Sequence, residues 1–480
     1  MSMDRVMQAF DRDVTTPVVN GAEEPPDWDE PLADSAVSHT RPGLLPEEFW
    51  DARKSFGHIR RAAHSRACSG DVVFYTTLAR MSGMISHHIR AATGIGGRAS
   101  LNVFAATVGA SGTGKSTGSA LSRELMPSPH SHDDFYDGLP IGSGEGIAEA
   151  FMGVVEKDTD KVYERGPHKD KPITVKVREQ VRHNLYCYVD EGQTLAQLGQ
   201  RSGSTLAETI RRAAVGEALG QTNASEERRR YVAPGSYAMG MLAGFQPSTA
   251  VPLLADASTG TPQRFFWSWA EDPSIPDEPT PWPGAIEDHL GCWRPSGPVD
   301  IDFPDSVKRR LWRDRVARNR GEIEISELDG HAGLMKVKLA AMFALLDGRD
   351  KVTEDDWDLA EMAWTASCAV RDALVARAKR EADVARELQE QAAVQLAVRT
   401  HDAKTAADLA VERVARRVLH IASATPGGVT YGALRKSITS RDRGMTEKAI
   451  TFAVSRGWVT EENDRICVRT DLVEGGHGGR

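Results

Sequence analysis

Apolar residues alternate along the middle of this chain between continuous runs and runs with helical spacing. The continuous runs, which are typical of buried strands, lie at 101–108, 185–189, 239–245 and 265–269. Residues 146–154 and 206–214 instead carry apolar residues at helical spacing. Strands and helices that alternate in this way indicate a parallel sheet covered by helices. We therefore predict an α/β domain over residues 96–275.

The segment before this domain is predicted to be helical. One apolar stripe at helical spacing runs through residues 45–95, formed by Phe49, Ala52, Phe56, Ile59 and Ala63. We interpret this segment as an N-terminal helical collar. Residues 1–44 lack such periodicity, and the first 50 residues carry eleven Asp or Glu against three Arg. This acidic tail is predicted to be disordered and solubilising, although it could also mimic DNA or dock a basic partner.

Charge and proline content define two further segments. Residues 155–182 are rich in Lys, Asp and Glu, and we predict a surface loop or hairpin there. Residues 276–300 are rich in proline and are predicted to be an irregular connector. Helical patterns then follow at 303–320, at 334–346 and from Thr353 toward residue 400, with Thr353 as N-cap. Residues 301–403 are therefore predicted to form a helical lid and a long helix.

Residues 404–470 show the order of elements of a winged helix-turn-helix. Helices are predicted at 406–421, 431–437 and 446–456, with a short extended piece at 428–430 and a hairpin over 458–468. The basic residues Arg441, Arg443 and Lys448 lie at the start of the predicted recognition helix, which indicates contacts with duplex DNA. Winged helices also dock proteins, so both kinds of partner stay open. A Gly-rich tail, 471–480, follows.

Cysteine usage and hydropathy indicate the cellular compartment of the protein. The chain has five cysteines without a C-x-x-C pair, which argues against a zinc ribbon and against a disulfide framework. No apolar segment approaches the roughly 18 residues of a membrane span, so no membrane partner is expected. Arg is far commoner than Lys, a composition that suggests a GC-rich bacterial genome. We expect a protein of the reducing cytoplasm of a bacterial host cell.

The chain contains the phosphate-binding loop pattern G-x-x-x-x-G-K-[ST] directly after the first apolar run. The loop consists of Gly109, Ala110, Ser111, Gly112, Thr113, Gly114, Lys115, Ser116 and Thr117. Its glycines let backbone N–H groups turn inward toward phosphates. Lys115 is predicted to reach the β- and γ-phosphates, and Ser116 to ligate Mg²⁺. ATP and Mg²⁺ are therefore the expected cofactors. The alternative interpretation of these residues is a flexible Gly/Ser linker without a ligand.

Two carboxylates follow the second apolar run. Asp190 is predicted to hold Mg²⁺, and Glu191, the next residue, to polarise the water that attacks the γ-phosphate. This is the arrangement of a Walker B motif. Glu145 is a rival for the catalytic base, because in RecA-like ATPases the base lies on the strand that follows the phosphate-loop helix. We prefer Glu191, since adjacent Asp and Glu are typical of AAA+ ATPases.

Three further polar features are candidate functional sites. Gln246 ends the apolar run at 239–245 and could sense the γ-phosphate or the attacking water, or simply face solvent. Arg264 precedes the last apolar run and is predicted to act in a neighbouring subunit as an arginine finger, unless it merely caps the sheet. The run Arg228, Arg229 and Arg230 suits contacts with single-stranded DNA in a central channel, or is a solvated charge run.

The motifs together resemble the helicase half of primase-helicase proteins from actinobacterial phages, prophages and mobile elements. They are residues 100–103 before the loop, 142–147, 189–191, 205–206, 220–223, 244–247, 263–265, 338–341 and 352–357. The resemblance covers about residues 45–400, and the motif order is also similar to MCM and superfamily-three ring helicases. It implies a P-loop ATPase of AAA+ or RecA-like type that assembles as a homo-hexameric DNA motor. Because residues 1–95 are too short for a primase module, a separate primase or initiator is expected.

Three functions therefore compete. The first is an ATP-dependent ring helicase or translocase that replicates a phage, prophage or mobile element. The second is an ATPase switch, such as a replication initiator, a helicase loader or a phage-defence ATPase. The third is a non-enzymatic DNA-binding regulator that uses the winged helix and carries a vestigial ATP site. The intact residues Lys115, Ser116, Asp190 and Glu191 argue against it.

Overall fold

A computed structural model describes most of the chain between residues 41 and 469. The described residues are 41–128, 134–162, 165, 168, 170–192, 195, 205–221, 230–255, 260–286 and 293–469. Arg228 and Arg229 and nearly all of the predicted acidic tail therefore lie outside the described residues, as does the Gly-rich tail. The chain divides into two units, Met1–Asp372 and Ala373–Arg480.

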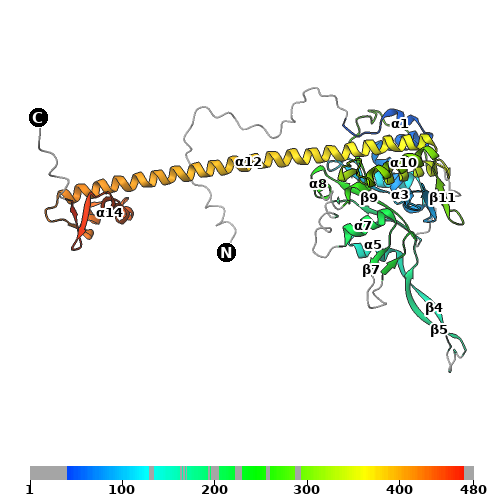
Figure 1. Ribbon diagram of the computed structural model, residues 1–480, viewed down its shortest axis with the longest axis horizontal. Coiled ribbons are helices and arrows are strands. Elements are labelled where there is room, and N and C mark those ends of the chain that lie inside the picture. Colours follow the sequence, from blue (N-terminus) through cyan, green and yellow to red (C-terminus); the bar gives the residue numbers. More distant parts are fainter. Residues whose placement is uncertain are drawn as a thin grey trace. The chain divides into compact units, whose positions relative to one another are not determined.

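The first unit is built on a five-stranded sheet in which every strand is parallel to its neighbours (Figure 1). Its order is β10-β2-β9-β6-β3, and the strands are β2 (Phe104–Val108), β3 (Phe135–Leu139), β6 (Asn184–Val189), β9 (Ala238–Phe245) and β10 (Phe265–Trp269). The predicted parallel sheet is confirmed. The sequence prediction missed only β3 among these strands. Since β9 lies between β2 and β6, the two predicted motif strands are not adjacent.

Helices flank this sheet. They are α3 (Gly70–Met84), α4 (Lys115–Leu125), α5 (Gly144–Phe151), α7 (Leu206–Val215) and α8 (Pro247–Ala255). Every residue of α3 is buried, and the helix packs directly on the strands. Glycines permit this close approach, because a Cβ atom on Gly83 would lie 2.5 Å from the Leu185 oxygen, and one on Gly240 would lie 1.8 Å from the Ala79 oxygen.

The predicted N-terminal collar forms part of the same hydrophobic core as the sheet. It contains α1 (Glu47–Asp51), α2 (Lys54–His64), α3 and a short strand, β1 (Ile89–Ala92). The predicted apolar stripe is wrong at one position, because Ala52 is exposed at the break between α1 and α2. The other members, Phe49, Phe56, Ile59 and Ala63, are buried.

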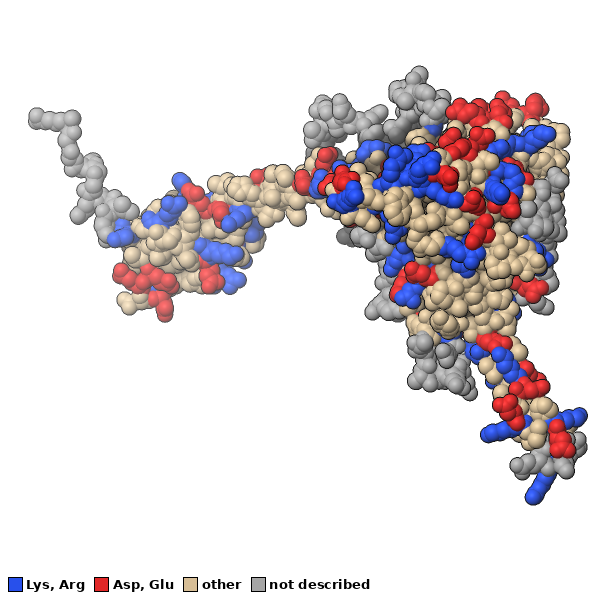
Figure 2. All heavy atoms as spheres, turned by 45° about the vertical axis from the view of Figure 1, so that its right-hand side comes forward, with Lys and Arg blue, Asp and Glu red and all other residues tan. Residues whose placement is uncertain are grey.

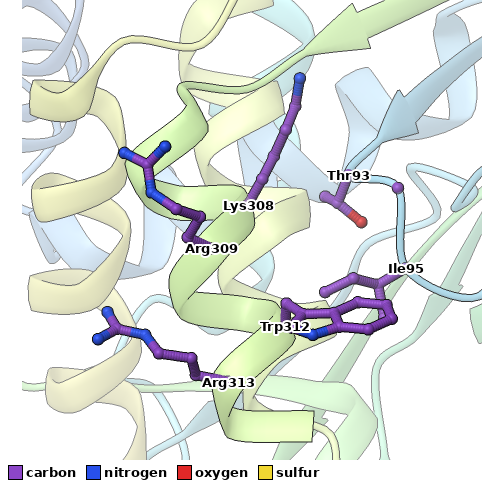
Figure 3. A pocket seen from close by; sticks show the side chains of 7 residues that line it. Thr93, Ile95, Lys308, Arg309, Trp312 and Arg313 are labelled. Atoms are coloured by element: carbon purple, nitrogen blue, oxygen red, sulfur yellow. The ribbon is translucent and has the colours of Figure 1, made fainter. Parts of the chain in front are cut away.

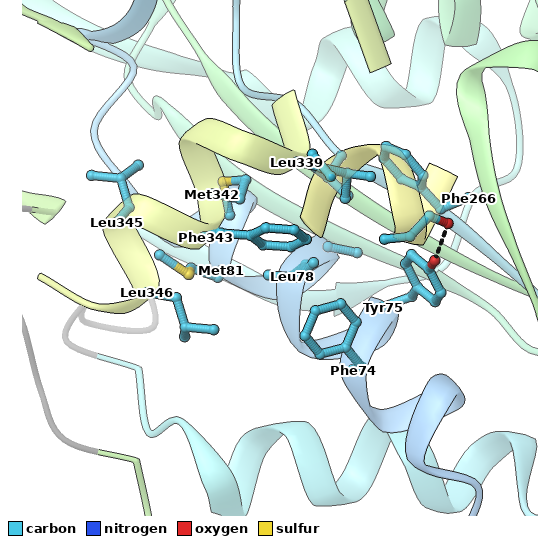
Figure 4. Packing of buried hydrophobic residues seen from close by; sticks show 14 of the residues in the cluster. Phe74, Tyr75, Leu78, Met81, Phe266, Leu339, Met342, Phe343, Leu345 and Leu346 are labelled. Atoms are coloured by element: carbon cyan, nitrogen blue, oxygen red, sulfur yellow. Dashed lines mark hydrogen bonds between the residues drawn. The ribbon is translucent and has the colours of Figure 1, made fainter. Parts of the chain in front are cut away.

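Two helices of the predicted lid complete this core. They are α10 (Asp305–Asn319) and α11 (Ala332–Leu346), joined by a short 3-10 turn, η6 (Glu327–Asp329). Figure 4 shows Phe343 of α11 packed among the side chains of α3, and its ring lies 5.8 Å from Phe74 and 5.0 Å from Phe56. The Tyr75 hydroxyl donates to the Ala363 main-chain oxygen at 2.7 Å.

The charged insertion is a hairpin, as predicted. Its strands β4 (Met152–Val162) and β5 (Pro172–Gln180) are antiparallel and extend away from the sheet of the first unit (Figure 1). Both signs of charge line it (Figure 2), with pairs such as Lys157 and Glu179 across the strands. Two smaller sheets pair β1 with β11 (Val299–Asp302), and β7 (Leu219–Gln221) with β8 (Arg230–Val232).

A single helix, α12 (Glu354–Ser423), replaces the two helices that the sequence predicted on either side of residue 403. It contains neither Gly nor Pro, so no helix-breaking residue interrupts it near residue 403. Its start matches the prediction, since Thr353 Oγ1 accepts from the Asp356 N–H at 3.3 Å and the Asp356 carboxylate accepts from the Thr353 N–H at 2.8 Å. Among the described residues, no helix has both the length and the apolar composition of a bilayer span.

The second unit ends in a compact group of short elements with its own core. They are β12 (Val429–Thr430), α13 (Tyr431–Ser437), η7 (Arg443–Met445), α14 (Thr446–Ser455), β13 (Val459–Glu462) and β14 (Arg465–Val468). The strands form an antiparallel sheet in the order β12-β14-β13. Val418, Leu434 and Ile450 meet in its core. The predicted order of elements in 404–470 is present, and α14 ends one residue before the prediction.

Lys338 on α11 is buried without a carboxylate partner among the described residues. Its Nζ atom donates to the main-chain oxygen of Asn102 at 2.6 Å and to that of Ala214. Burial lowers the pKa of Lys338 to about 7, and the nearby Arg264 acts in the same direction. A neutral amine still has two N–H groups, which is enough for both carbonyl oxygens.

Lys338→Met is therefore expected to flatten the rise of stability with pH above neutrality. Between pH 7 and the ordinary Lys value of 10.5, the unfolded chain holds a proton that the folded chain has released. The free energy of unfolding then gains about 1.4 kcal/mol per pH unit from this group. Urea unfolding of both proteins from about pH 7.5 to 9.5 measures the two slopes, and equal slopes would contradict a neutral buried Lys338.

Candidate functional site

The predicted phosphate-binding loop connects the carboxyl end of β2 to the first turn of α4. Gly112 (φ +83°) and Gly114 (φ +84°) both adopt the left-handed conformation that other residues rarely tolerate. Gly114 is also the N-cap of α4, so the loop leads straight into a helix N-terminus. Such an end presents free N–H groups and a partial positive charge, which favours anions.

A pocket of about 350 Å³ opens at this end of the sheet. Its lining comes from the loop and from the ends of β6 and β9, namely Ser111, Gly112, Gly114, Lys115, Ser116, Thr117, Asp190, Glu191, Gly192, Gly244, Phe245, Gln246 and Thr249. The parallel register explains this, because Val108 of β2 lies opposite Phe245 of β9, and Val189 of β6 opposite Ala243. The loop and the acidic and amide residues predicted from separate motifs therefore share one pocket.

Lys115 is folded back onto its own loop. Its Nζ atom donates to the main-chain oxygens of Gly109 (2.8 Å) and Ala110 (2.5 Å). Partial burial lowers the pKa of Lys115, while Glu271 and Asp190 oppose that shift. These contacts place the ammonium group within the loop. A bound phosphate can replace the two carbonyl oxygens as its partner.

Tyr188 is a residue of this site that the sequence prediction missed. Its hydroxyl donates to Asp190 Oδ1 at 2.6 Å, and burial together with this contact raises the pKa of Tyr188. The signal was present in the sequence, because residues two apart on a strand point to the same side. Tyr188 thereby orients the Asp190 carboxylate at the mouth of the pocket.

Glu271 and Cys68 also touch the loop from outside the predicted motifs. Glu271 follows β10, and its carboxylate accepts from the Ala110 N–H at 3.4 Å and lies 3.5 Å from Arg41. Cys68, just before α3, lies with its sulfur 3.6 Å from the Gly114 oxygen. The collar and the segment after the edge strand β10 therefore both contact the loop.

Glu145, the rival base, lies elsewhere. Its carboxylate accepts from Thr205 Oγ1 at 3.0 Å and Gln221 Nε2 at 3.3 Å, and it lines a separate pocket of about 160 Å³. A backbone N–H and the Thr205 hydroxyl stabilise its charged form, which lowers the pKa of Glu145. Within the described part of the chain, Glu145 does not line the pocket that holds Lys115.

Arg264 ends a short turn, η5 (Pro262–Arg264), at the amino end of β10. Phe265 lies opposite Phe104, the first residue of β2, so Arg264 is at the sheet edge opposite the phosphate-binding loop. Its Nη1 atom donates to the Gly260 oxygen, and Arg211 nearby donates to Thr261 Oγ1 at 3.1 Å. Burial and the charge of Arg211 lower the pKa of Arg264.

The predicted DNA contacts differ in their surroundings. Arg230 lies in β8, and its Nε atom donates to Glu149 Oε2 at 2.6 Å, so its charge is already paired. Arg441, Arg443 and Lys448 are exposed around η7 and the first turn of α14.

The function of this chain has to be inferred from its own residues. No protein-family model matches this chain, and no curated protein matches it either.

Proposed function

We propose that this chain is a P-loop ATPase of AAA+ or RecA-like type that works on DNA. The observation that carries the proposal is the shared pocket at the carboxyl edge of the parallel sheet. It brings together Lys115, Ser116, Asp190, Glu191 and Gln246 from three different loops. Ligand sites of open parallel sheets lie at this edge, outside the carboxyl ends of the strands.

The groups in the pocket suit the parts of a nucleoside triphosphate. The loop N–H groups and the α4 N-terminus face the phosphates, and Lys115 pairs with the β- and γ-phosphates. Ser116 and Asp190 supply the hard oxygen atoms that Mg²⁺ prefers, and bound Mg²⁺ would offset the negative charge of the phosphates. Both residues line the pocket, so the chain fits this cation.

Glu191 is the group that we assign as the base. It lies one residue beyond Asp190 and lines the same pocket as the loop. There it orients a water molecule, whose oxygen forms a bond to the γ-phosphorus as the bond to the ADP oxygen breaks. Glu191 accepts the proton of that water, and ADP and phosphate are the products.

Glu191→Gln is expected to bind ATP normally and to hydrolyse it at least about a hundredfold more slowly, because a neutral amide cannot accept the proton. The matched variant Glu145→Gln should keep most of the activity, since Glu145 lines a separate pocket. Phosphate release and binding of a fluorescent ATP analogue measure the two effects. The opposite ranking of the two variants would assign the base to Glu145 and the core to the RecA-like type.

The second unit supports DNA as the partner. Its order of helices and its antiparallel sheet with a hairpin correspond to a winged helix, with Arg441, Arg443 and Lys448 exposed at the recognition helix. We propose a homo-hexameric helicase or translocase that uses ATP in replication of a phage, prophage or mobile element. A separate primase or initiator would then start replication.

A strand-separation assay on forked DNA in the presence of ATP tests this proposed helicase activity. ATP-dependent strand separation by the wild type, lost in Glu191→Gln, is the expected result. ATP hydrolysis without strand separation, by a protein that does not form rings, would assign the chain to ATPase switches such as initiators, loaders or phage-defence ATPases.

A further inference from the structure

Trp312 on α10 is 60 % exposed. The other tryptophans among the described residues are buried or half-buried. An aromatic ring of this size normally stabilises a core or an interface. The ring lies on α10, whose buried residue Val307 packs into the first unit, and it is accessible to a ligand.

The indole forms part of the wall of a second pocket, of about 470 Å³. The pocket lies between α10 and the loop after β1, and its lining is Thr93, Gly94, Ile95, Lys308, Arg309, Trp312 and Arg313. Figure 3 shows the indole lying over Ile95, with Lys308 above it on the same helix and Arg309 and Arg313 extending from the other side of that helix. Lys308 and Trp312 are four residues apart and are therefore neighbours on the helix surface.

The charge around the indole is positive. From Asp305 to Asn319, α10 carries six basic residues and two acidic ones. Lys308 is paired with Asp302 at 2.6 Å, but Arg309 and Arg313 are exposed and have no ion pair with any carboxylate among the described residues. Both guanidinium groups are thus available to an anionic ligand.

We propose that Trp312, Arg309 and Arg313, with the loop at 93–95, form a binding platform for single-stranded nucleic acid. One base stacks on the exposed indole in the pocket, and the adjoining phosphates pair with the two guanidinium groups. Aromatic rings combined with a cationic groove are how proteins hold single strands without reading their sequence.

Charge selects this occupant over an apolar protein surface. An apolar partner seated on Trp312 would desolvate Arg309 and Arg313 without offering them an opposite charge, which is costly. A polyanion with flat apolar rings satisfies the indole and both cations together.

The platform shares no lining residue with the ATP pocket. The platform gives the proposed DNA motor a further contact with the DNA strand, and in this respect it rests on the proposed function. Binding of nucleic acid to the platform needs no ATP hydrolysis. The Lys115→Ala variant, defective in hydrolysis, should therefore bind through Trp312 as the wild type does.

The test uses the full chain without ATP. The probe is a fluorescent oligothymidylate of about 20 nucleotides, which is long enough to cover the usual sizes of single-strand binding sites. Trp312→Ala should weaken binding by about five- to a hundredfold, the loss expected for one stacked base, and Trp312→Phe should restore most of it. Replacing both Arg309 and Arg313 by Ala should reduce the slope of log affinity against log salt by about 1.4.

Arg320→Ala is the matched control, because Arg320 is exposed just beyond the same helix and already pairs with Glu322. It should leave the affinity nearly unchanged. A photoreactive oligothymidylate carrying 5-iododeoxyuridine should crosslink to the peptide that contains Trp312. Unchanged affinity in Trp312→Ala, or crosslinks only to other peptides, would overturn the platform. A Trp312 crosslink in a protein that cannot unwind DNA would leave the platform standing and refute the motor.

Discussion

Lys115→Ala is expected to abolish ATP hydrolysis and to weaken nucleotide binding. Among the described residues that line the pocket, Lys115 is the only one with a cationic side chain. Its ammonium group already lies inside the loop, on the oxygens of Gly109 and Ala110. Without it, the charge that develops on the transferring phosphoryl group meets no side-chain cation among the described residues that line this pocket.

Phosphate release at saturating ATP and titration with a fluorescent ATP analogue measure the two effects. Lys351→Ala is a suitable control, because it removes an exposed lysine that does not line the pocket. The unfolding transition of each variant should match the wild type, which separates loss of chemistry from loss of fold. Hydrolysis at the normal rate by Lys115→Ala would exclude this pocket as an ATPase site.

The site was largely predictable because its parts are local signals joined by one topological rule. Each motif follows an apolar run, and the carboxyl ends of parallel strands meet at one edge of a sheet. Asp190 and Gln246, 56 residues apart in the numbering, therefore line one pocket with Lys115. The rule also explains why Glu145 was a real rival, since α5 begins after another strand of the same sheet.

Features that depend on distant partners were not predictable. The strand β3 contains Asp137 and Gly138, which are unfavourable in strands. Asp137 is tolerated because the buried Arg80 of α3 donates to its carboxylate at 3.0 and 2.8 Å. Likewise, nothing in the spacing of residues 45–95 reveals that α3 is buried on every side, since that depends on the sheet and on α11 together.

Arg264→Ala is expected to leave ATP affinity nearly unchanged and to reduce turnover by roughly a thousandfold, the lower end of the range for losing an arginine finger. In its own chain, Arg264 lies at the amino end of β10, across the sheet from the phosphate-binding loop. A catalytic role is therefore possible only in the pocket of a neighbouring subunit. Burial and Arg211 disfavour its charge in the isolated chain, so a neighbour's γ-phosphate would be a favourable partner.

Mixing experiments distinguish this role from a structural one. If Arg264 acts in the neighbouring subunit, Arg264→Ala subunits should lower the activity of mixed rings by more than their share of the subunits, whereas a merely destabilised variant should lower it only by dilution. Arg264→Lys should not rescue turnover, because an ammonium group lacks the planar fork of donors. Mass photometry with ATP and single-stranded DNA should show about six subunits. A strictly monomeric protein with full ATPase activity would leave Arg264 without a catalytic role and favour the ATPase switch over the motor.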